Sequence, residues 1–411
     1  MYSSNLTLIV PTYDRPELLE KTLAFVCKLT DMPIIVADGS SGSTSQKNSD
    51  ICRRVGHNIK YFCQPVAEDP IGKTNNYRAR VLEAVSLVET PYVAMCADDD
   101  LILPGFAQRC AEFLDDNPDY IACHGSYLGF SKSLTGLDIN TIVYDGPSID
   151  GSEVATRLMQ LYSNYEATFY AVYRTAVQKK LLECMPSDLE RFLMLETTQS
   201  AATAISGKVK RLEGIYYLRN LGVPPHARDV EGWNQWMAQD FPEFYACFTK
   251  HRERMLALAS RQAGKAFDAL RTARAFDMMF LLYVGREFHL GFWLDEYLRT
   301  LIDNESERNG MRLRLEGPKS QLRSQPAGVA DQIRGAVKRI TRLIAGEIGL
   351  ARLHRIKATL VGDKPSANGI VITEHFPHIS ISPAVWGHFK VADWEEIGHV
   401  LTEFVEQWPA D

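Results

Sequence analysis

The chain has 411 residues, of which 45% are hydrophobic and 23% charged, and these proportions exclude a disordered or collagen-like chain. Its 45 basic and 51 acidic residues give a net charge of −6, so the overall charge provides no electrostatic reason to bind nucleic acid. No apolar run approaches the ~18–20 residues that span a bilayer, and the N-terminus lacks the basic start and apolar stretch of a signal peptide.

The first 130 residues alternate between strand and helix patterns. Short apolar runs predict five strands, at 6–10, 33–37, 59–63, 92–97 and 120–128. Apolar residues at helical spacing predict three helices, at 16–29, 74–88 and 105–116. Buried strands that alternate with helices are typical of an α/β fold with a mostly parallel sheet. Polar clusters follow three of these strands, where ligands of such sheets bind, at 11–15, 38–41 and 98–100.

The rest of the chain divides into regions of different character. Residues 131–150 are rich in loop-forming residues, and the runs at 209–212 and 215–218 predict a hairpin around Glu213-Gly214. From about residue 250 the pattern is helical, and Gly317-Pro318 marks a break. We therefore expect a catalytic domain over 1–248, a helical extension over 249–316, and a region over 317–411 with a basic amphipathic helix and a small mixed part.

Three adjacent acids, Asp98, Asp99 and Asp100, directly follow the fourth predicted strand. Their mutual repulsion costs free energy unless a cation or solvent relieves it. Hard oxygen ligands suit Mg²⁺ or Mn²⁺, which usually bridge carboxylates and substrate phosphates. The alternative is a capping cluster for the helix that follows Pro104, where acids are favoured.

Three motifs in this order resemble family 2 glycosyltransferases of the GT-A fold. They read Leu8-Ile9-Val10-Pro11-Thr12-Tyr13-Asp14-Arg15, Val36-Ala37-Asp38-Gly39-Ser40-Ser41 and Ala97-Asp98-Asp99-Asp100, and the resemblance covers roughly residues 5–220. It implies a Rossmann-like sheet flanked by helices, a nucleotide-sugar donor, a divalent metal and inversion at the anomeric carbon. Uridine is the commonest base in the family, so a UDP-sugar is the expected donor.

The resemblance also places residues around the donor. Residues 11–14 correspond to the loop that passes the nucleoside in family members. Asp38 matches the family's base-binding residue, and Asp98 matches a ribose-binding residue. Lys73 and Arg78 are candidates for contacts with phosphate or base, because cations offset the charge of a diphosphate. The expected donor-binding residues are Pro11, Thr12, Tyr13, Asp14, Asp38, Arg78, Asp98, Arg219 and Arg228.

The metal ligands are less sharply defined. Asp99 matches a family metal ligand, and Asp100 competes with it because Asp98-x-Asp100 also forms an Asp-x-Asp motif. Many family members carry Asp where this chain has Ala97, which leaves the geometry at the metal open. His226 is a further candidate, since the family sometimes places a His on the metal in the loop that closes over the diphosphate.

Inversion requires a general base that takes the proton of the acceptor hydroxyl. The family carries this acid on a helix about ten residues before a Gly-Lys or Gly-Tyr turn, and Glu196 lies eleven residues before Gly207. Glu190 and Asp188 are the runners-up, and Leu195 replaces an acid that the family usually has. Helical periodicity places Glu196 close to the apolar face, which favours a cleft over bulk solvent.

We therefore expect a metal-dependent inverting glycosyltransferase that acts on a hydroxyl of a saccharide or lipid-linked saccharide. One alternative is a non-catalytic subunit that binds nucleotide sugars, which the residues at 97 and 195 would fit. Another is a sugar-phosphate nucleotidyltransferase. Such enzymes open with a Gly-rich loop ending in Arg at a strand end, and the loop at 11–15 lacks the glycines.

Residues 319–357 carry nine basic and two acidic residues, and apolar positions at helical spacing run through 329–357. Such a helix can lie on an anionic membrane surface, or it can pack on the catalytic domain or in a homo-oligomer. The eight cysteines form no Cys-x-x-Cys pair, so we expect reduced cysteines in a cytoplasmic protein, peripheral to the inner face of the membrane if the basic helix binds it.

Overall fold

The computed structural model describes residues 5–65, 70–133, 136–189, 191–222, 236, 240–279, 371–372 and 379–406. The chain divides into one compact unit of Met1–Phe288 with Ile370–Asp411 and a second of His289–Gly369. The second unit, and with it the basic stretch 329–357, lies outside the described residues, so membrane contact and oligomerisation remain predictions. No helix in the described part of the chain has the length and hydropathy of a membrane span.

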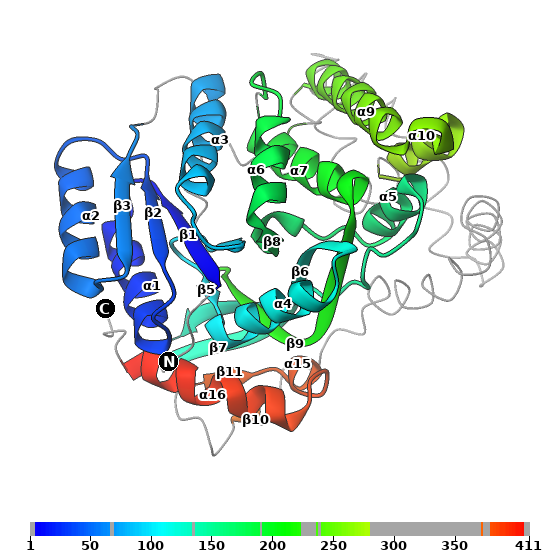
Figure 1. Ribbon diagram of the computed structural model, residues 1–411. Coiled ribbons are helices and arrows are strands. Elements are labelled where there is room, and N and C mark those ends of the chain that lie inside the picture. The colour runs from blue at the N-terminus through cyan, green and yellow to red at the C-terminus, as the bar shows by residue number, and fades with distance from the viewer. Residues whose placement is uncertain are drawn as a thin grey trace, which may run out of the picture. The chain divides into compact units, whose positions relative to one another are not determined.

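The N-terminal half of the sheet is parallel, in the order β4-β1-β2-β3 (Figure 1). Its strands are β1 (Leu6–Thr12), β2 (Ile34–Asp38), β3 (Ile59–Cys63) and β4 (Tyr92–Met95). β1 continues through Pro11, where the sequence predicted that it would stop. Proline is tolerated there because the pairing with β4 ends at Ile9, so no ladder bond to β4 is lost.

Three helices connect these strands: α1 (Pro16–Leu29), α2 (Gly42–Val55) and α3 (Pro70–Ser86). α1 contacts α2, whereas α3 contacts β1, β2 and α6 (Thr175–Glu183). α2 has no counterpart among the predicted elements, because only Asn48, Ile51 and Cys52 of its residues are buried and its apolar stripe is short. α1 agrees with the prediction, including Pro16 in its first turn.

The second half of the sheet is mixed. It contains β5 (Leu101–Ile102), β6 (Tyr120–Ser133), β7 (Gly136–Tyr144), β8 (Val172–Arg174) and β9 (Lys208–Asn220). β8 joins the halves by pairing antiparallel with both β4 and β6. Part of the loop predicted over 131–150 is strand β7, whose Leu137 and Ile139 are buried and alternate with more exposed residues.

The hairpin predicted around Glu213-Gly214 is wrong, because β9 is one continuous strand paired parallel with β6 along its length. Gly214 has a φ of +118°, which other residues rarely adopt, and the register shifts opposite it, between His124 and Ser126. The glycine therefore forms an irregularity within the strand instead of a reversal. Because the strand continues, its end pairs with β5 and lies beside the acidic motif.

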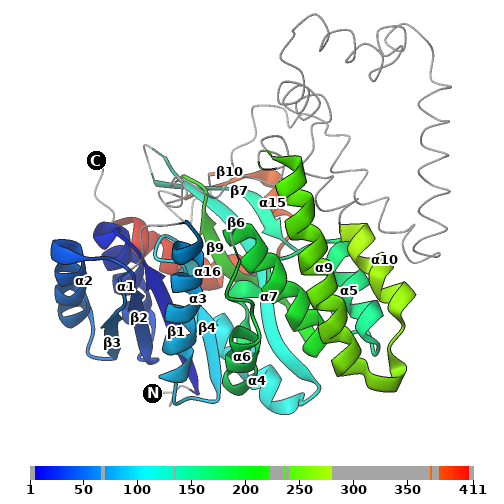
Figure 2. The same cartoon turned by 90° about the horizontal axis from the view of Figure 1, so that it is seen from above.

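The remaining helices lie against the mixed half of the sheet and against one another (Figure 2). They are α4 (Pro104–Asp116), α5 (Val154–Ser163), η1 (Thr168–Tyr170), α7 (Phe192–Ser206), α9 (Phe241–Ala263), η2 (Gly264–Ala266) and α10 (Ala269–Met278). α7 packs between α5 and α9. α9 runs without a break through residue 249, where a domain boundary is predicted.

The C-terminal segment is built into the same sheet. It contains β10 (Val371–Ile372), β11 (Ile379–Ile381), α15 (Pro383–Trp386) and α16 (Val391–Glu406), and β11 pairs in parallel with β7. Trp394 is 1% exposed, its ring stacks on Trp386 at 5.4 Å, and it belongs to the main hydrophobic core. The described part of this segment therefore completes the core of the first unit.

We expect Trp394→Ala to lower the free energy of unfolding by about 3–5 kcal/mol, because it leaves a large cavity in the core. Val391→Ala, at an exposed position of the same helix, should change it by less than about 0.5 kcal/mol. Urea unfolding followed by circular dichroism measures both. An unchanged main transition in the Trp394 variant would show that the segment does not share the core.

Candidate active site

The acidic motif follows the carboxyl end of β4 and is held by side chains from three other elements. Asp98, 6% exposed, accepts a 2.7 Å hydrogen bond from the Thr12 hydroxyl at the end of β1. Asp100, 4% exposed, accepts hydrogen bonds from the Tyr217 hydroxyl at 2.9 Å and the Asn220 amide at 2.7 Å, both on β9. The Thr22 hydroxyl on α1 donates to the Asp98 carbonyl at 2.8 Å.

These carboxylates are crowded. Burial, and after it the charge of Asp99, raises the pKa of Asp98 and of Asp100 to about 7. Hydrogen bonds from Thr12 to Asp98 and from Asn220 to Asp100 lower these pKa values only in part. The motif therefore carries more negative charge than its hydrogen bonds compensate, which favours a nearby cation.

The donor set fits a divalent cation that takes its remaining ligands from a diphosphate. No group of three His, Cys, Asp or Glu side chains is arranged for a metal within the described residues, but Mg²⁺ is commonly held by one or two carboxylates plus substrate phosphates. Both Asp100 oxygens accept hydrogen bonds from the protein, whereas Asp99 accepts one from Arg15 at Oδ2. Asp99 is thus the more accessible ligand, and His226 lies outside the described residues.

Asp38, at the end of β2, is completely buried. It accepts hydrogen bonds from the Ser40 amide at 2.7 Å, the Asn48 amide group at 2.9 Å and the Tyr61 hydroxyl at 2.8 Å. In this arrangement Asp38 orders the loop after β2. Its predicted contact with the nucleotide base stays a prediction.

The first loop is tied to that second loop. The Gly39 amide donates to the Thr12 carbonyl at 2.9 Å, and the Asp14 amide donates to the Ser40 hydroxyl at 2.8 Å. Tyr13 lies between these contacts and is 37% exposed. An exposed aromatic ring at the carboxyl edge of a parallel sheet is suited to stack on a flat ligand.

Sequence reasoning singled out Arg78 and missed Arg80. Arg78 donates to the Leu182 carbonyl at 3.3 Å, between α3 and α6. Arg80 is 2% exposed, lies 5.6 Å from the Tyr77 ring, and its Nε and Nη1 groups have no hydrogen-bond partner in the described part of the chain. Burial lowers its pKa, while Tyr77 and Asp38 raise it. The side chain of Lys73 is outside the described set.

Glu196 lies in α7 and is half-buried. Burial raises its pKa, whereas the charge of Arg219 and a hydrogen bond from Tyr165 lower it. Arg219, at the end of β9, also lowers the pKa of Asp100, after the larger effects of burial, Asp99 and two hydrogen bonds. One arginine therefore acts on the acidic motif and on the predicted base.

Tyrosines provide a second link between the two carboxylate groups. Burial raises the pKa of Tyr77 and of Tyr170. The charge of Glu196 raises both pKa values further, as does Asp98 for Tyr77 and Asp100 for Tyr170. Glu196 and the acidic motif are thus both near enough to these tyrosines to act on them electrostatically. Arg228 lies outside the described residues.

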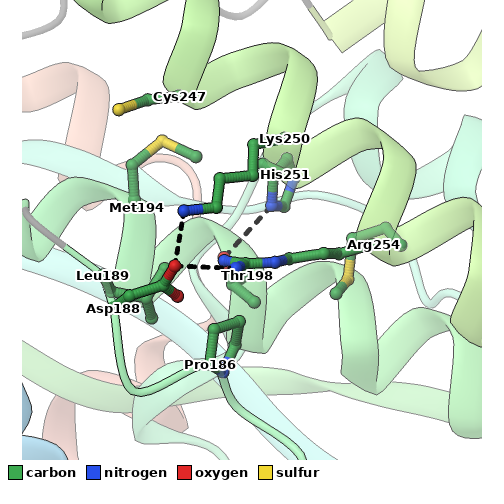
Figure 3. A pocket seen from close by; sticks show the side chains of 10 residues that line it. Pro186, Asp188, Leu189, Met194, Thr198, Cys247, Lys250, His251 and Arg254 are labelled. Carbon is green, nitrogen blue, oxygen red and sulfur yellow. Dashed lines mark hydrogen bonds and ion pairs between the residues drawn. The ribbon is translucent and has the colours of Figure 1, made fainter.

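One runner-up for the base, Asp188, is engaged in ion pairs with two cations of α9. Asp188 pairs with Lys250 and, at 2.8 Å, with Arg254, and hydrogen bonds from both hold its pKa well below the ordinary range. Asp188 lines a pocket of about 30 Å³ between α7 and α9, which also contains the Thr198–His251 hydrogen bond of 3.1 Å (Figure 3). Glu190 lies outside the described residues.

A second buried acid, Glu166, was also missed. It is 6% exposed and accepts a 3.4 Å hydrogen bond from the Asn164 side chain, and burial raises its pKa to about 8. A Cβ atom at Gly146 would lie 2.4 Å from its carboxylate, so the glycine leaves room for the acid. The aromatic residues around position 166 in the sequence were the available signal for burial.

Comparison with known proteins identifies the N-terminal part of the chain. Residues 7–185 match a family model described as Glycosyl transferase family 2. These residues form a family 2 glycosyltransferase domain. The match confirms the resemblance of the three motifs and the GT-A class of the α/β fold. Glu196 and Arg219 lie beyond the matched residues, so the match does not bear on their roles.

Several solved structures of glycosyltransferases resemble the chain at low identity. S. aureus TarS is 16% identical over 71% of this chain and 47% of its own, with a TM-score of 0.44. TarS 1–349 in complex with UDP-GlcNAc is 14% identical over 72% and 78%, with a TM-score of 0.44. Mannosyltransferase PcManGT from Pyrobaculum calidifontis in complex with GDP-Man and Mn²⁺ is 14% identical over 87% and 88%, with a TM-score of 0.41.

The chain spans about half the length of the full TarS structure. No curated protein sequence matches it. These comparisons therefore do not identify the donor or the acceptor of this protein.

The buried Glu166 makes the glycosyltransferase domain sensitive to pH. The folded state keeps this proton up to pH 8, whereas an exposed Glu releases it near 4.5, so stability falls as pH rises between these values. Relative to Glu166→Gln, which mimics the protonated acid, the wild type should lose on the order of 4 kcal/mol across this window. Urea unfolding of both proteins from pH 4.5 to 8 measures the difference, and parallel curves would contradict it.

Proposed function

We propose that this chain transfers a sugar from a nucleotide-sugar donor, a UDP-sugar, to a hydroxyl group of a saccharide or lipid-linked saccharide, with inversion at the anomeric carbon. The observation that carries the proposal is the buried acidic motif at the end of β4, which lies inside the residues that match the glycosyltransferase model. The charge of Arg219, which lowers the pKa of both Asp100 and Glu196, supports an acceptor site near Glu196. A donor at the acidic motif and an acceptor at Glu196 then share one region. Pairing a phosphate site with a carboxylate base is what this reaction needs.

On the donor side, the nucleoside lies along the loops after β1 and β2, with Tyr13 available for stacking and Asp98 for the ribose. Arg80 supports this placement, because its unpaired N–H groups are suited to a carbonyl or phosphate oxygen of the donor. Burying an arginine without partners costs free energy, and a bound nucleotide would recover part of it. Arg78, Arg219 and Arg228 are the remaining candidates for the diphosphate.

Asp99 would hold a Mg²⁺ or Mn²⁺ ion, with Asp100 as the competing ligand. Such an ion supplies positive charge to the diphosphate as it leaves. Arg219 contributes a fixed positive charge on the acceptor side of the motif, where it also lowers the pKa of Glu196. A single arginine between leaving group and base therefore helps both to keep the charges that the reaction requires.

Glu196 takes the acceptor proton. As the acceptor oxygen bonds to the anomeric carbon, the bond from that carbon to the phosphate oxygen breaks, and the hydroxyl proton passes to the Glu196 carboxylate. Partial burial raises the pKa of Glu196, which makes it a stronger base than an exposed carboxylate. The hydrogen bond from Tyr165 orients the carboxylate for this transfer.

Replacing Glu196 by Gln should keep the donor bound but remove the proton acceptor. We expect release of UDP from UDP-sugars, with water or a saccharide as acceptor, to fall by ~10²–10⁴. Calorimetry should find unchanged affinity for UDP. Asp188→Asn is the matched control, since Asp188 is held by Lys250 and Arg254 away from this region, and it should retain turnover.

Turnover by Glu196→Gln at the wild-type rate would remove Glu196 from the mechanism. Nucleotide binding without turnover in any UDP-, GDP- or CDP-sugar would support the alternative of a non-catalytic binding subunit. Thermal-shift measurements with the three nucleotide diphosphates, with and without Mn²⁺, identify the base, because a ligand that binds only the native state raises stability.

Asp99→Ala should abolish the part of UDP affinity that depends on Mn²⁺ and leave the unfolding transition intact. Asp99 contacts Arg15 and is only partly buried, so its loss does not disturb the hydrogen bonds of Asp98 or Asp100. Calorimetric titration of UDP with Mn²⁺ or with a chelator measures the effect. Equal Mn²⁺-dependent affinity in variant and wild type would exclude Asp99 as the ligand.

A further inference from the structure

Arg15 is the cation that contacts the acidic motif. Its Nη1 lies 2.7 Å from Oδ2 of Asp99 and 3.5 Å from Oδ1 of Asp98, and its side chain is 13% exposed. These two carboxylates are the predicted metal ligand and ribose contact. The guanidinium therefore lies in contact with an oxygen atom of Asp99 that a divalent ion would need.

The backbone conformation at Asp14 precedes Arg15 and helps to set the direction of its side chain. Asp14 has a φ of +54°, and it is the one non-glycine residue with a positive φ within the described part of the chain. Residues other than glycine rarely adopt such a conformation, and it persists where neighbouring contacts enforce it. Here the hydrogen bond from the Asp14 amide to Ser40 fixes it, and Arg15 follows as the N-cap residue of α1.

Charge balance sets the Arg15 contact in competition with metal binding at Asp99. Among the described residues Arg15 is in ion-pair contact with Asp98 and Asp99, so it is a counter-ion of both. A divalent ion on Asp99 would bring two positive charges to the same oxygen atom. The guanidinium would then be repelled, and a diphosphate arriving with the metal offers it new acceptors that suit a bidentate fork.

We propose that Arg15 stands in for the metal in the donor-free protein and transfers from Asp99 to the donor diphosphate when the metal and donor bind. Arg15 is thus both a placeholder that keeps the acidic motif in order and a ligand of the diphosphate in the loaded enzyme. This inference rests on the proposed function for its donor and metal. It predicts opposite effects of one substitution on the two ligands.

The experiment measures Mn²⁺ alone and UDP with Mn²⁺ on the same variants. Free Mn²⁺ is followed by its electron paramagnetic resonance signal, and UDP affinity by calorimetry at saturating Mn²⁺. Arg15→Ala should bind Mn²⁺ alone about tenfold more tightly, since the competing cation is gone, and UDP about tenfold more weakly, since a charge-assisted contact is lost. Arg54→Ala, which removes an exposed arginine paired with Glu20, should match the wild type in both.

Arg15→Lys keeps the charge without the planar fork and covers the case in which the alanine variant does not fold. It should keep Mn²⁺ affinity near that of the wild type and still weaken UDP binding. The proposal is overturned if Arg15→Ala binds Mn²⁺ with unchanged affinity, or if it binds UDP with unchanged affinity. It is also overturned if no variant binds Mn²⁺ in the presence of UDP. None of these readouts requires turnover, so they are distinguishable from a failure of donor hydrolysis, which would overturn the proposed function.

Discussion

The buried carboxylates at the end of β4 are the constraint on which the rest of the site depends. Asp98 and Asp100 remain buried only because separate elements bring donors to them: Thr12 from β1, and Tyr217 with Asn220 from β9. The same contacts fix the distance between the parallel half of the sheet and the long strand β9. The fold and the candidate donor site are therefore stabilised by one set of hydrogen bonds.

β9 extends that constraint to the acceptor side. It runs parallel to β6, keeps its direction through the irregularity at Gly214, and ends with Arg219 beyond the acidic motif. There the charge of Arg219 lowers the pKa of both Asp100 and Glu196. The end of one strand therefore links the proposed donor site to the proposed base. α7, which carries Glu196, is in turn packed between α5 and α9. The position of Glu196 is thus set by the packing of its helix rather than by a flexible loop.

How far the sequence predicts this site depends on how local each signal is. The acidic motif and Glu196 follow from short motifs and spacing, since strand ends and helix faces are local properties. Arg80 and Glu166 were missed because their burial arises from neighbours distant in the sequence, and a charged residue is normally expected at the surface. The prediction of a hairpin at Gly214 was wrong because a glycine between two apolar runs indicates a turn as well as it indicates an irregularity within one strand.

The central claim is that donor and acceptor sites share the region between the acidic motif and Glu196. A crystal structure with UDP and Mn²⁺ tests it most directly. The account predicts the metal on Asp99, the diphosphate in contact with Arg219, and Glu196 facing the open side of the β-phosphate. Nucleotide bound away from the carboxyl end of β4, or a Glu196 separated from the phosphates by packed side chains, would contradict it.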